Sequence, residues 1–257
     1  MFAEEHHSEG NYFWLFSGSN QNVEFSDRIP DARDDKNYPF VTRNLGEELI
    51  RKGRSFRGYS EGLPEIGGTE CMDAENHYAR KHVPWISFKN LLGGRDPKSS
   101  TNLQFEQFPS DFDSLPTVSF VIPNLINDMH DPWDTPAVAI KHGDDWLRKN
   151  LDGYYQWSKT HNSLLILTFD ENEDSIDACG LTNPASAQSD SQNVIPTIIA
   201  GAHVKHGDFA EGKGITHVNI LRTIEAMYGL RKSGAQQRYA LEFGISSDGA
   251  LEDIFER

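Results

Sequence analysis

The chain has 257 residues, of which 37% are hydrophobic and 11% aromatic, and this composition excludes a wholly disordered protein. Acidic residues outnumber basic ones by 39 to 24, and the formal net charge of −15 argues against general nucleic-acid binding, which needs a basic surface. No apolar run approaches the ~18 residues of a membrane span, and the start lacks a signal-peptide pattern. We therefore expect one folded domain over residues 1–257.

Helical and strand patterns alternate along the chain. The expected elements, in order, are a helix over 11–18, a helix over 44–53, a strand over 55–61, a buried strand over 117–124, a long helix over 137–160, a buried strand over 163–169, a strand over 194–201 and a helix over 217–230. The polar stretches between them are expected to be loops, namely 19–43, 93–114 and 172–193. This alternation predicts an α/β fold with a mostly parallel central sheet and helices on both faces.

Polar residues follow three of the predicted strands, and in an open α/β sheet ligands bind beyond the carboxyl ends of the strands. These residues are Asn127, Asp128, His130 and Asp131 after the first buried strand, Asp170 and Glu171 after the second, and Gly201, Ala202 and His203 after the last. The adjacent carboxylates Asp170 and Glu171 repel each other unless a cation or a proton lies between them. They indicate either a divalent-metal site or a solvated acidic loop.

Histidines and cations occur in three other places. His130 could be a metal ligand, a donor to a substrate oxygen or an ordinary loop histidine, and His217 stands at a helix start, where polar residues are common for local reasons. The stretch NHYARKHVPW is the densest positive patch of an acidic chain. Beside a metal held by carboxylates it would bind phosphate; otherwise it is a surface loop with paired charges.

The stretch EEHHSEGNYFWLFSG places Ser8 just before the first predicted helix. Serine is a common N-cap residue, which accounts for its position without any catalysis. A helix N-terminus is also an anion site, and a serine there becomes a nucleophile if a metal lowers the pKa of its hydroxyl. No GxSxG elbow is present, so acyl transfer has little support. Cys71 and Cys179 have no metal-binding spacing, and the sequence leaves a disulfide between them open.

Several segments together resemble the secreted acid phosphatases of the phosphoesterase family, which includes phosphatidylcholine-type phospholipases C and belongs to the alkaline-phosphatase-like superfamily. The segments, in order, are HHSEGNYFWLFSGSNQ, FRGYSEGLP, YARKHVPW, FPSDFDSLPTVSFVIPNLINDMHDP, WSKTHNSLLILTFDEN, IPTIIAGAHVKHG and THVNILRTIEAMYGL. The resemblance covers roughly residues 2–230 and leaves 231–257 as a C-terminal extension. It implies a metal-dependent hydrolase of phosphate monoesters that acts through a phosphoserine intermediate.

The resemblance also implies a role for each candidate site residue. These are Ser8 as nucleophile and metal ligand, Asn11 as donor to a phosphoryl oxygen, Arg80, Lys81 and His82 along the phosphate site, Asp128 and His130 in the pocket, Asp170 and Glu171 as metal ligands, and His217 as a phosphate or leaving-group contact. A divalent ion of unspecified identity is the implied cofactor. The implied partner is a small phosphorylated substrate, with a phospholipid headgroup as one option, and the implied location is secreted or periplasmic.

The chain departs from the family pattern at two points. The family stretch reads His-Pro-Ser-Glu-Pro-Asn-Tyr, and here His7 and Gly10 replace both prolines, which is expected to loosen the turn that positions Ser8. Family members also begin with a buried strand ending in Glu-Asn that supplies further metal ligands, and the matched region begins after that point. Two alternatives stay open: a phospholipase C-type phosphodiesterase, which the family also includes, and an inactive or truncated phosphoesterase-like fold, which the missing metal ligands suggest.

Overall fold

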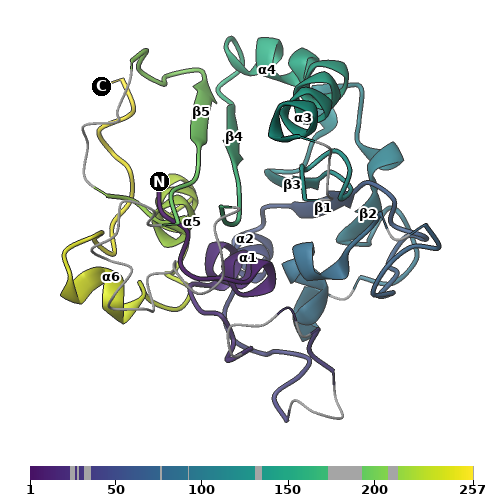
Figure 1. The fold of residues 1–257 in the computed structure, drawn as a ribbon, viewed down its shortest axis with the longest axis horizontal. Helices are drawn as coiled ribbons and strands as arrows, with labels where there is room; N and C mark the ends of the chain where they lie inside the picture. The colour runs from purple at the N-terminus through teal and green to yellow at the C-terminus, as the bar shows by residue number, and fades with distance from the viewer. Residues whose placement is uncertain are drawn as a thin grey trace.

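Two separate groups of strands form the β-structure of the molecule (Figure 1). The computed structural model describes residues 1–23, 27, 29–31, 36–75, 77–91, 93–130, 135–172, 193–207 and 214–256. A parallel sheet has the strand order β2-β1-β3, and its members are β1 (Phe56–Ser60), β2 (Asn102–Gln104) and β3 (Val118–Ile122). The other group is an antiparallel pair of β4 (Leu164–Thr168) and β5 (Thr197–Gly201).

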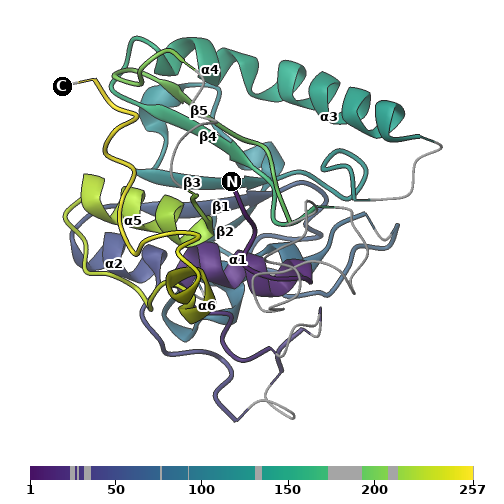
Figure 2. The same ribbon diagram turned by 60° about the vertical axis from the view of Figure 1, so that its left-hand side comes forward.

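Helices cover both faces of the strands, as the sequence predicted (Figure 2). One layer holds α1 (Ser8–Ser17), α2 (Leu45–Arg51), α5 (His217–Met227) and the short α6 (Arg238–Glu242), and the opposite layer holds α3 (Pro136–Asn150) and α4 (Asp152–Ser158). Between α2 and α3 in the chain, the described residues form five short 3₁₀ helices: Arg80–His82, Pro84–Ser87, Lys89–Leu91, Phe105–Gln107 and Phe112–Ser114. Within the described ranges, no helix has both the length and the apolar character needed to cross a bilayer.

Aromatic side chains fill the core between α1 and the parallel sheet. Phe16 packs against Phe56 and Phe88 with ring centroids 5.3 and 5.6 Å apart, and Phe56 lies edge-on to Trp85. Gly58 of β1 lies against the Trp85 indole, and a Cβ at this position would overlap the ring. This glycine therefore lets a fully buried tryptophan lie directly on the strand.

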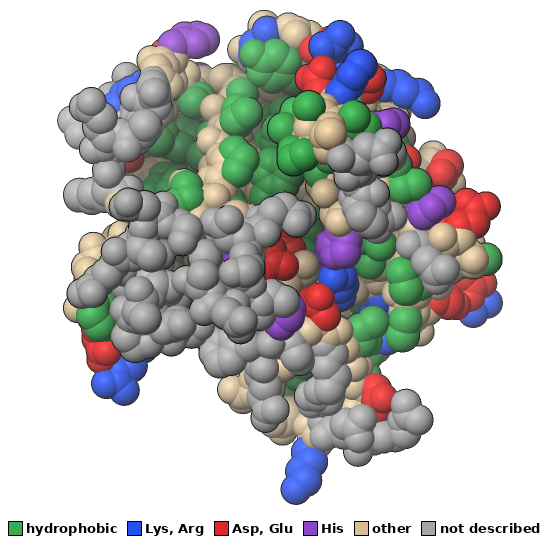
Figure 3. All heavy atoms as spheres, in the orientation of Figure 1, with side chains coloured by type: hydrophobic (Ala, Val, Ile, Leu, Met, Phe, Trp, Pro, Cys, Tyr) green, Lys and Arg blue, Asp and Glu red, His purple; other side chains and the backbone are tan. Residues whose placement is uncertain are grey.

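The expectation of one mostly parallel sheet is correct for β1 to β3 and wrong for β4 and β5. β5 runs antiparallel to β4, and among the described residues no ladder joins β3 to β4. As a result, every residue of β3 and β4 is only partly buried, although both strands were predicted to be buried. Figure 3 shows hydrophobic side chains gathered on the surface over β4, β5 and the neighbouring helix α3.

Two further elements differ from the predicted ones. The helical pattern over 137–160 forms two helices, because Leu151 leaves helical geometry with ψ of −9° and the Asn150 side chain donates to the Trp146 carbonyl. β2 lies within 93–114, which was predicted to be a loop; it has only three residues, too few for a period-2 pattern to be visible. Most of the predicted loop over 172–193 lies outside the described residues.

Candidate active site

Ser8 and Glu171 bring the first helix and the end of β4 together. Ser8 Oγ donates to Glu171 Oε1 over 3.0 Å, and His6 Nδ1 lies 2.5 Å from Glu171 Oε2. Ser8 is the first residue of α1 rather than its N-cap; the N-cap is His7, which makes no side-chain capping bond. The N-cap interpretation of Ser8 is therefore wrong, since its buried hydroxyl is committed to a carboxylate.

Asp170 lies beside this pair at the end of β4. Burial raises the pKa of the Asp170 carboxyl, and the neighbouring Glu171 raises it further, while His82 and a hydrogen bond from Ser8 oppose the rise. Two adjacent carboxylates at the end of an apolar strand thus favour a positive charge or a proton between them. Ser8 lies within hydrogen-bonding reach of both acids.

Asn11 holds the turn that leads into Ser8. Its Oδ1 accepts from the backbone N–H groups of Glu4 and Glu5 at 2.9 and 3.0 Å, and its Nδ2 donates to the carbonyls of Glu5 and His7. Both amide hydrogens are used within the turn, and the side chain is fully buried. The structure therefore makes Asn11 a clamp of the turn, which differs from the predicted donor to a phosphoryl oxygen.

Gly10 leaves room for a buried carboxylate. A Cβ at Gly10 would overlap Glu5 Oε1, and the Glu5 carboxylate accepts from Trp14 Nε1 and Asn20 Nδ2. The loss of a proline here was expected to loosen the turn. Instead, the absent side chain admits Glu5, which ties the turn to α1 and to the loop beyond it.

Lys81 supplies a positive charge next to the start of α1. Its Nζ lies 2.8 Å from Asp27 Oδ2 and 3.0 Å from His130 Nε2, and Asp27 Oδ1 accepts from the backbone N–H of Glu9 in the first turn of α1. Although burial opposes ionisation, the Lys81 ammonium holds the pKa of Asp27 below its ordinary value. Lys81, Asp27 and His130 therefore form one charged rim at the N-terminus of α1.

His82 forms the other side of the rim. Its Nδ1 lies 3.2 Å from Asp128 Oδ2, and its ring stacks on Tyr12 with centroids 5.0 Å apart. Burial, Asp170 and other nearby acids hold the pKa of the Tyr12 hydroxyl well above its ordinary value, so this ring stays neutral. Arg80 is turned elsewhere, towards the Tyr38 hydroxyl and the Thr69 carbonyl, and so does not share the position of Lys81 and His82.

His217 begins α5 and is buried below the end of β4. Its Nε2 donates to the Phe169 carbonyl over 2.9 Å, and burial lowers the pKa of the ring to about 4. His217 is therefore a neutral imidazole at neutral pH, with Nδ1 as its free acceptor atom. A neutral ring can accept a hydrogen bond or bind a cation through Nδ1, but it cannot neutralise phosphate charge.

The model of the phosphoesterase family matches residues 1–231, nearly all of the chain. The chain belongs to the phosphoesterase family. A phosphatidylinositol-3-phosphatase of Mycobacterium tuberculosis is 40% identical over 235 residues, which cover 91% of this chain and 66% of that protein. A phosphate-repressible acid phosphatase of Penicillium chrysogenum is 27% identical over 240 residues, covering 91% of this chain and 52% of the relative.

A solved structure supports the fold. A Vibrio parahaemolyticus protein of the alkaline phosphatase superfamily superposes with a TM-score of 0.55 at 11% identity, over 90% of this chain and 57% of that chain. The α/β class predicted from the sequence is thereby confirmed. The phosphoesterase chain thus spans between about half and two thirds of the lengths of these curated relatives and of this structural neighbour.

The donor chemistry of the phosphoesterase site fits a divalent metal ion. Asp170, Glu171 and the Ser8 hydroxyl are oxygen ligands of the kind that such ions take. Within the described part of the chain, three nearby imidazole nitrogens are buried without a hydrogen-bond partner: His6 Nε2, His82 Nε2 and His217 Nδ1. Among the described residues, however, no group of three His, Cys, Asp or Glu side chains is arranged as a ready-made metal site.

The third predicted strand end lies away from the site. Because β5 is antiparallel to β4, its carboxyl end, with Gly201, Ala202 and His203, lies at the opposite end of the strand pair from Asp170. The start of β5 lies near the site instead, where Asn193 accepts from the Asn172 N–H and donates to the Glu5 carbonyl. Asp131 and Cys179 lie outside the described residues, and Cys71 is an exposed free thiol.

Three residues of the site were not identified from the sequence: His6, Tyr12 and Asp27. His6 and Tyr12 flank Ser8 within the stretch that carries the family resemblance, so their positions offered a signal. The sequence carries no comparable signal for Asp27, because it is one of several acidic residues in a polar loop and no pattern distinguishes it from the others. Only its contacts with Lys81 and α1 distinguish it from them.

Proposed function

We propose that this chain hydrolyses phosphate monoesters through a phosphoserine formed on Ser8. The observation that carries the proposal is the hydrogen bond from Ser8 Oγ to Glu171, made at the N-terminus of α1 with Lys81 close by. A nucleophile must be within hydrogen-bonding reach of a base, and a helix N-terminus attracts phosphate oxygens. Both conditions are met by one residue.

In the first step Ser8 Oγ attacks phosphorus in line with the departing alcohol oxygen. The hydroxyl proton passes to Glu171 Oε1, the bond between Oγ and phosphorus forms, and the bond from phosphorus to the alcohol oxygen breaks. His82, oriented by the 3.2 Å contact of its Nδ1 with Asp128 Oδ2, donates a proton to that oxygen. Lys81 and the first N–H groups of α1 offset the charge on the remaining phosphoryl oxygens.

In the second step a water molecule attacks the phosphoserine. His82, now neutral, takes a proton from the water, the oxygen of water bonds to phosphorus, and the bond to Oγ breaks. Glu171 returns its proton to Ser8 Oγ, and inorganic phosphate leaves. The two steps restore Ser8, His82 and Glu171 to their starting protonation states.

A divalent ion fits this scheme. Asp170, Glu171 and Ser8 would hold it, and it would lower the pKa of the serine hydroxyl and offset negative charge on the substrate. Burial of the adjacent carboxylates, which raises the pKa of Asp170, supports a cation there. His6 would keep its contact with Glu171 and so fix the orientation of that carboxylate.

The names of the relatives support this reaction class, since both are called phosphatases. The name of the mycobacterial relative refers to phosphatidylinositol 3-phosphate, so we propose phosphorylated headgroups as one class of substrate to test. A secreted or periplasmic location, which the family resemblance implied, is likewise proposed. Cell fractionation with an antibody against the chain would test it.

Replacing Ser8 tests the assignment of the nucleophile. Ser8→Ala should lower turnover of p-nitrophenyl phosphate by at least about a thousandfold, and the wild type should carry a phosphate on the Ser8 peptide after acid quenching. Ser17→Ala is the matched control, because Ser17 lies in the same helix and bonds only to the carbonyls of Phe13 and Ser19 and to the Gln21 amide. Full activity in Ser8→Ala would overturn the mechanism.

Two alternatives have distinct outcomes in the same assays. A phosphodiesterase of the phospholipase C type would turn over phosphatidylcholine faster than a phosphomonoester. An inactive fold would bind far less than one equivalent of divalent metal and show no phosphatase activity after metal addition. Metal content by mass spectrometry and activity on both substrates separate the three outcomes.

A further inference from the structure

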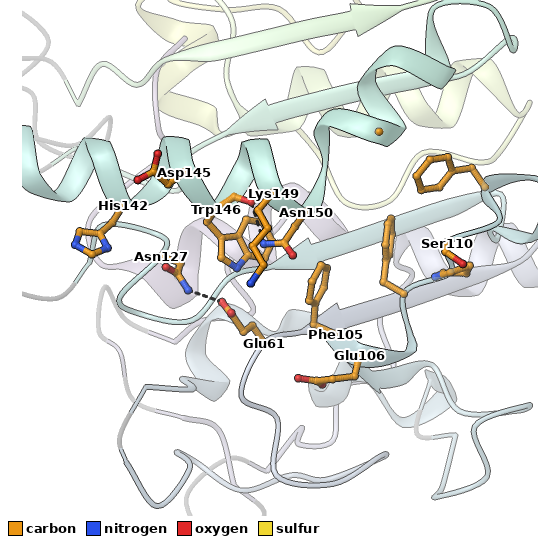
Figure 4. Close-up of a pocket in the computed structure, with 14 residues that line it drawn as sticks. Glu61, Phe105, Glu106, Ser110, Asn127, His142, Asp145, Trp146, Lys149 and Asn150 are labelled. Atoms are coloured by element: carbon orange, nitrogen blue, oxygen red, sulfur yellow. Dashed lines mark hydrogen bonds between the residues drawn. The ribbon is translucent and has the colours of Figure 1, made fainter.

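A cavity lies between α3 and the aromatic segment that follows β2 (Figure 4). Its volume of about 770 Å³ falls within the ~300–1,000 Å³ of small-molecule sites. Its walls combine aromatic rings with isolated polar groups. Its lining includes Glu61, Phe105, Glu106, Asn127, Trp146 and Lys149. None of them belongs to the site around Ser8.

One wall of this cavity is aromatic. Phe105 and Trp146 lie with ring centroids 5.1 Å apart, and Phe105 stacks on Phe108 with centroids 5.7 Å apart. Phe105 is only partly buried, so part of its surface faces the cavity. Aromatic faces of this kind pack against the C–H groups of a ring-shaped ligand.

The polar groups of the cavity carry both signs of charge. Glu61 Oε2 accepts from the Asn124 N–H and from Asn127 Nδ2, and these bonds fix the carboxylate, while Oε1 makes no hydrogen bond with a described residue (Figure 4). Lys149 is an exposed residue of α3 that also lines the cavity. The cavity therefore offers a fixed acceptor on Glu61, a donor on Lys149 and further carboxylates on Glu106 and on Asp145, of which Asp145 is paired with Lys141.

This mixture suits a neutral ligand that both donates and accepts hydrogen bonds. An anion would meet Glu61 and Glu106, and a cation, although attracted to these carboxylates, would leave Lys149 without an acceptor. The hydroxyls of a neutral polyhydroxylated ring donate to the carboxylates and accept from the ammonium group. Its C–H face would then lie on Phe105 and Trp146.

We infer that this cavity binds a neutral polyhydroxylated ring, either a sugar or a cyclitol, at a site separate from the phosphate-binding centre. The inference does not depend on the chemistry of Ser8. The cavity does touch the loop that carries Asp128, because Asn127 both bonds to Glu61 and precedes that residue. A ligand in the cavity would thus contact this loop at Asn127.

Binding of unphosphorylated probes tests the inference on the full chain. D-glucose and myo-inositol are titrated separately to about 100 mM, with calorimetry and tryptophan fluorescence as readouts, and the probe that saturates tells a sugar from a cyclitol site. We expect a dissociation constant of about 1–10 mM for one of them. Trp146→Phe should remove the fluorescence change and leave calorimetric binding within about threefold.

Two variants localise the binding. Lys149→Ala, an exposed helix position, and Phe105→Leu should each weaken the constant by at least about tenfold while turnover of p-nitrophenyl phosphate stays unchanged. Lys52→Ala, on an exposed residue beyond α2, is the matched control and should bind as the wild type does. Binding that persists in both cavity variants would overturn the inference, and so would the absence of saturation with either probe.

Inorganic phosphate separates the two sites. Phosphate at saturating concentration should leave the dissociation constant of the ring unchanged within about twofold. If phosphate instead displaces the ring, the ring occupies the centre around Ser8 and the assignment of the cavity is wrong. Loss of phosphatase activity in Ser8→Ala with ring binding retained would show that the inference stands independently of the proposed reaction.

Discussion

The N-terminal turn, residues 4–12, and the β4–β5 pair differ in the side chains that they bury. In the turn, Glu4, Glu5 and Asn11 are fully buried, and each makes hydrogen bonds with neighbouring groups. In the strand pair, β4 is apolar but only partly buried, and Ile198 of β5 is 56% exposed. The turn thus buries charge, while the strands expose hydrocarbon (Figure 3).

The difference indicates which region depends more strongly on specific contacts for its stability. Burying charged or amide groups is costly unless their hydrogen bonds are satisfied, so a turn built in this way has few alternative conformations. Half-exposed strands are held by backbone ladders and one packed face, and they tolerate change on the other face. We therefore expect large effects from substitutions in the turn and its partner Glu171, and small effects from outward positions of the strands.

Glu171→Gln should have the largest effect. The amide cannot take the proton of Ser8, and the contact with His6 loses its charge, so turnover of p-nitrophenyl phosphate should fall by about a thousandfold. Steady-state kinetics on the purified variant is the measurement. Glu242→Gln, at an exposed ion pair with Arg238, is the control. A loss smaller than about tenfold would argue that Glu171 is not the base.

Asn11→Ala should lower the free energy of unfolding by about 3 kcal/mol. The substitution leaves the buried N–H groups of Glu4 and Glu5 without their acceptor, whereas the Glu5 carbonyl keeps its bond from Asn193. Urea denaturation followed by circular dichroism measures the change. Asn162→Ala, on an exposed loop, should stay within about 0.5 kcal/mol of the wild type. Equal effects of the two variants would show that the clamp is unimportant.

Glu4→Gln should make stability less dependent on pH. Burial raises the pKa of Glu4 from 4.5 to about 7, so the native state binds this proton more tightly than the unfolded state. Its destabilising contribution is absent below pH 4.5, grows as pH rises towards about 7 and is complete above that. The variant should therefore be more stable than the wild type by about 2–3 kcal/mol above about pH 8.

Urea titrations at several pH values test this expectation, and the two proteins should converge as the pH approaches 4.5. Glu252→Gln, at an exposed position, is the control: it should change the free energy of unfolding only slightly, and by the same amount at every pH. If the advantage of Glu4→Gln were larger in acid than in alkali, the direction of the shift would be wrong.

Gly10→Ala should destabilise the protein by about 1–2 kcal/mol, although alanine is the better helix former. The added methyl group would displace the Glu5 carboxylate from its bonds with Trp14 and Asn20. Gly153→Ala in α4 is the matched control, because its Cβ would make only ordinary contacts with the Phe112 ring, and it should gain up to about 1 kcal/mol. The thermal unfolding midpoints of the Gly10→Ala and Gly153→Ala variants show whether the steric clash with Glu5 outweighs the higher helix propensity of alanine.

Ile198→Thr should have the smallest effect on stability, within about 0.5 kcal/mol. Its side chain is largely exposed, and threonine retains the β-branching that suits a strand. Light scattering at high concentration should show less self-association, because the hydrophobic surface over β4 and β5 shrinks. Ile199→Thr is the contrast, because Ile199 packs against the core and its replacement should cost about 1–3 kcal/mol. A large loss of stability in Ile198→Thr would place that side chain in the core.

Local patterns identified much of the fold and part of the site. The helices predicted over 11–18 and 44–53 and the strand predicted over 55–61 are found close to these bounds, as Ser8–Ser17, Leu45–Arg51 and Phe56–Ser60. Asp170 and Glu171 were identified for a similar reason, since two acids directly after an apolar run are visible in the sequence. Signals of this kind extend over only a few neighbouring residues.

Other features required the folded chain. An apolar run such as the one in β5 carries no direction, so its antiparallel pairing, and with it the exclusion of His203 from the site, could not be predicted. The contacts within the turn were not visible either. Ser8 was interpreted as an N-cap, whereas it is the first residue of α1 and donates to Glu171. The contact of Asn11 with a phosphoryl oxygen, implied by the family resemblance, stays a prediction, and in the structure its side chain bonds within the turn.

The sequence by itself determined the α/β class, the family and the chemical types gathered at the end of β4. Only the tertiary structure decided that His6 and Ser8 share one carboxylate, that Asp27 joins Lys81 to α1, and that β4 and β5 form a separate pair. The physical reason is the separation in sequence between the residues that interact. Capping and periodicity act between residues a few positions apart, whereas the contact of His6 with Glu171 joins groups 165 positions apart, and only folding brings them together.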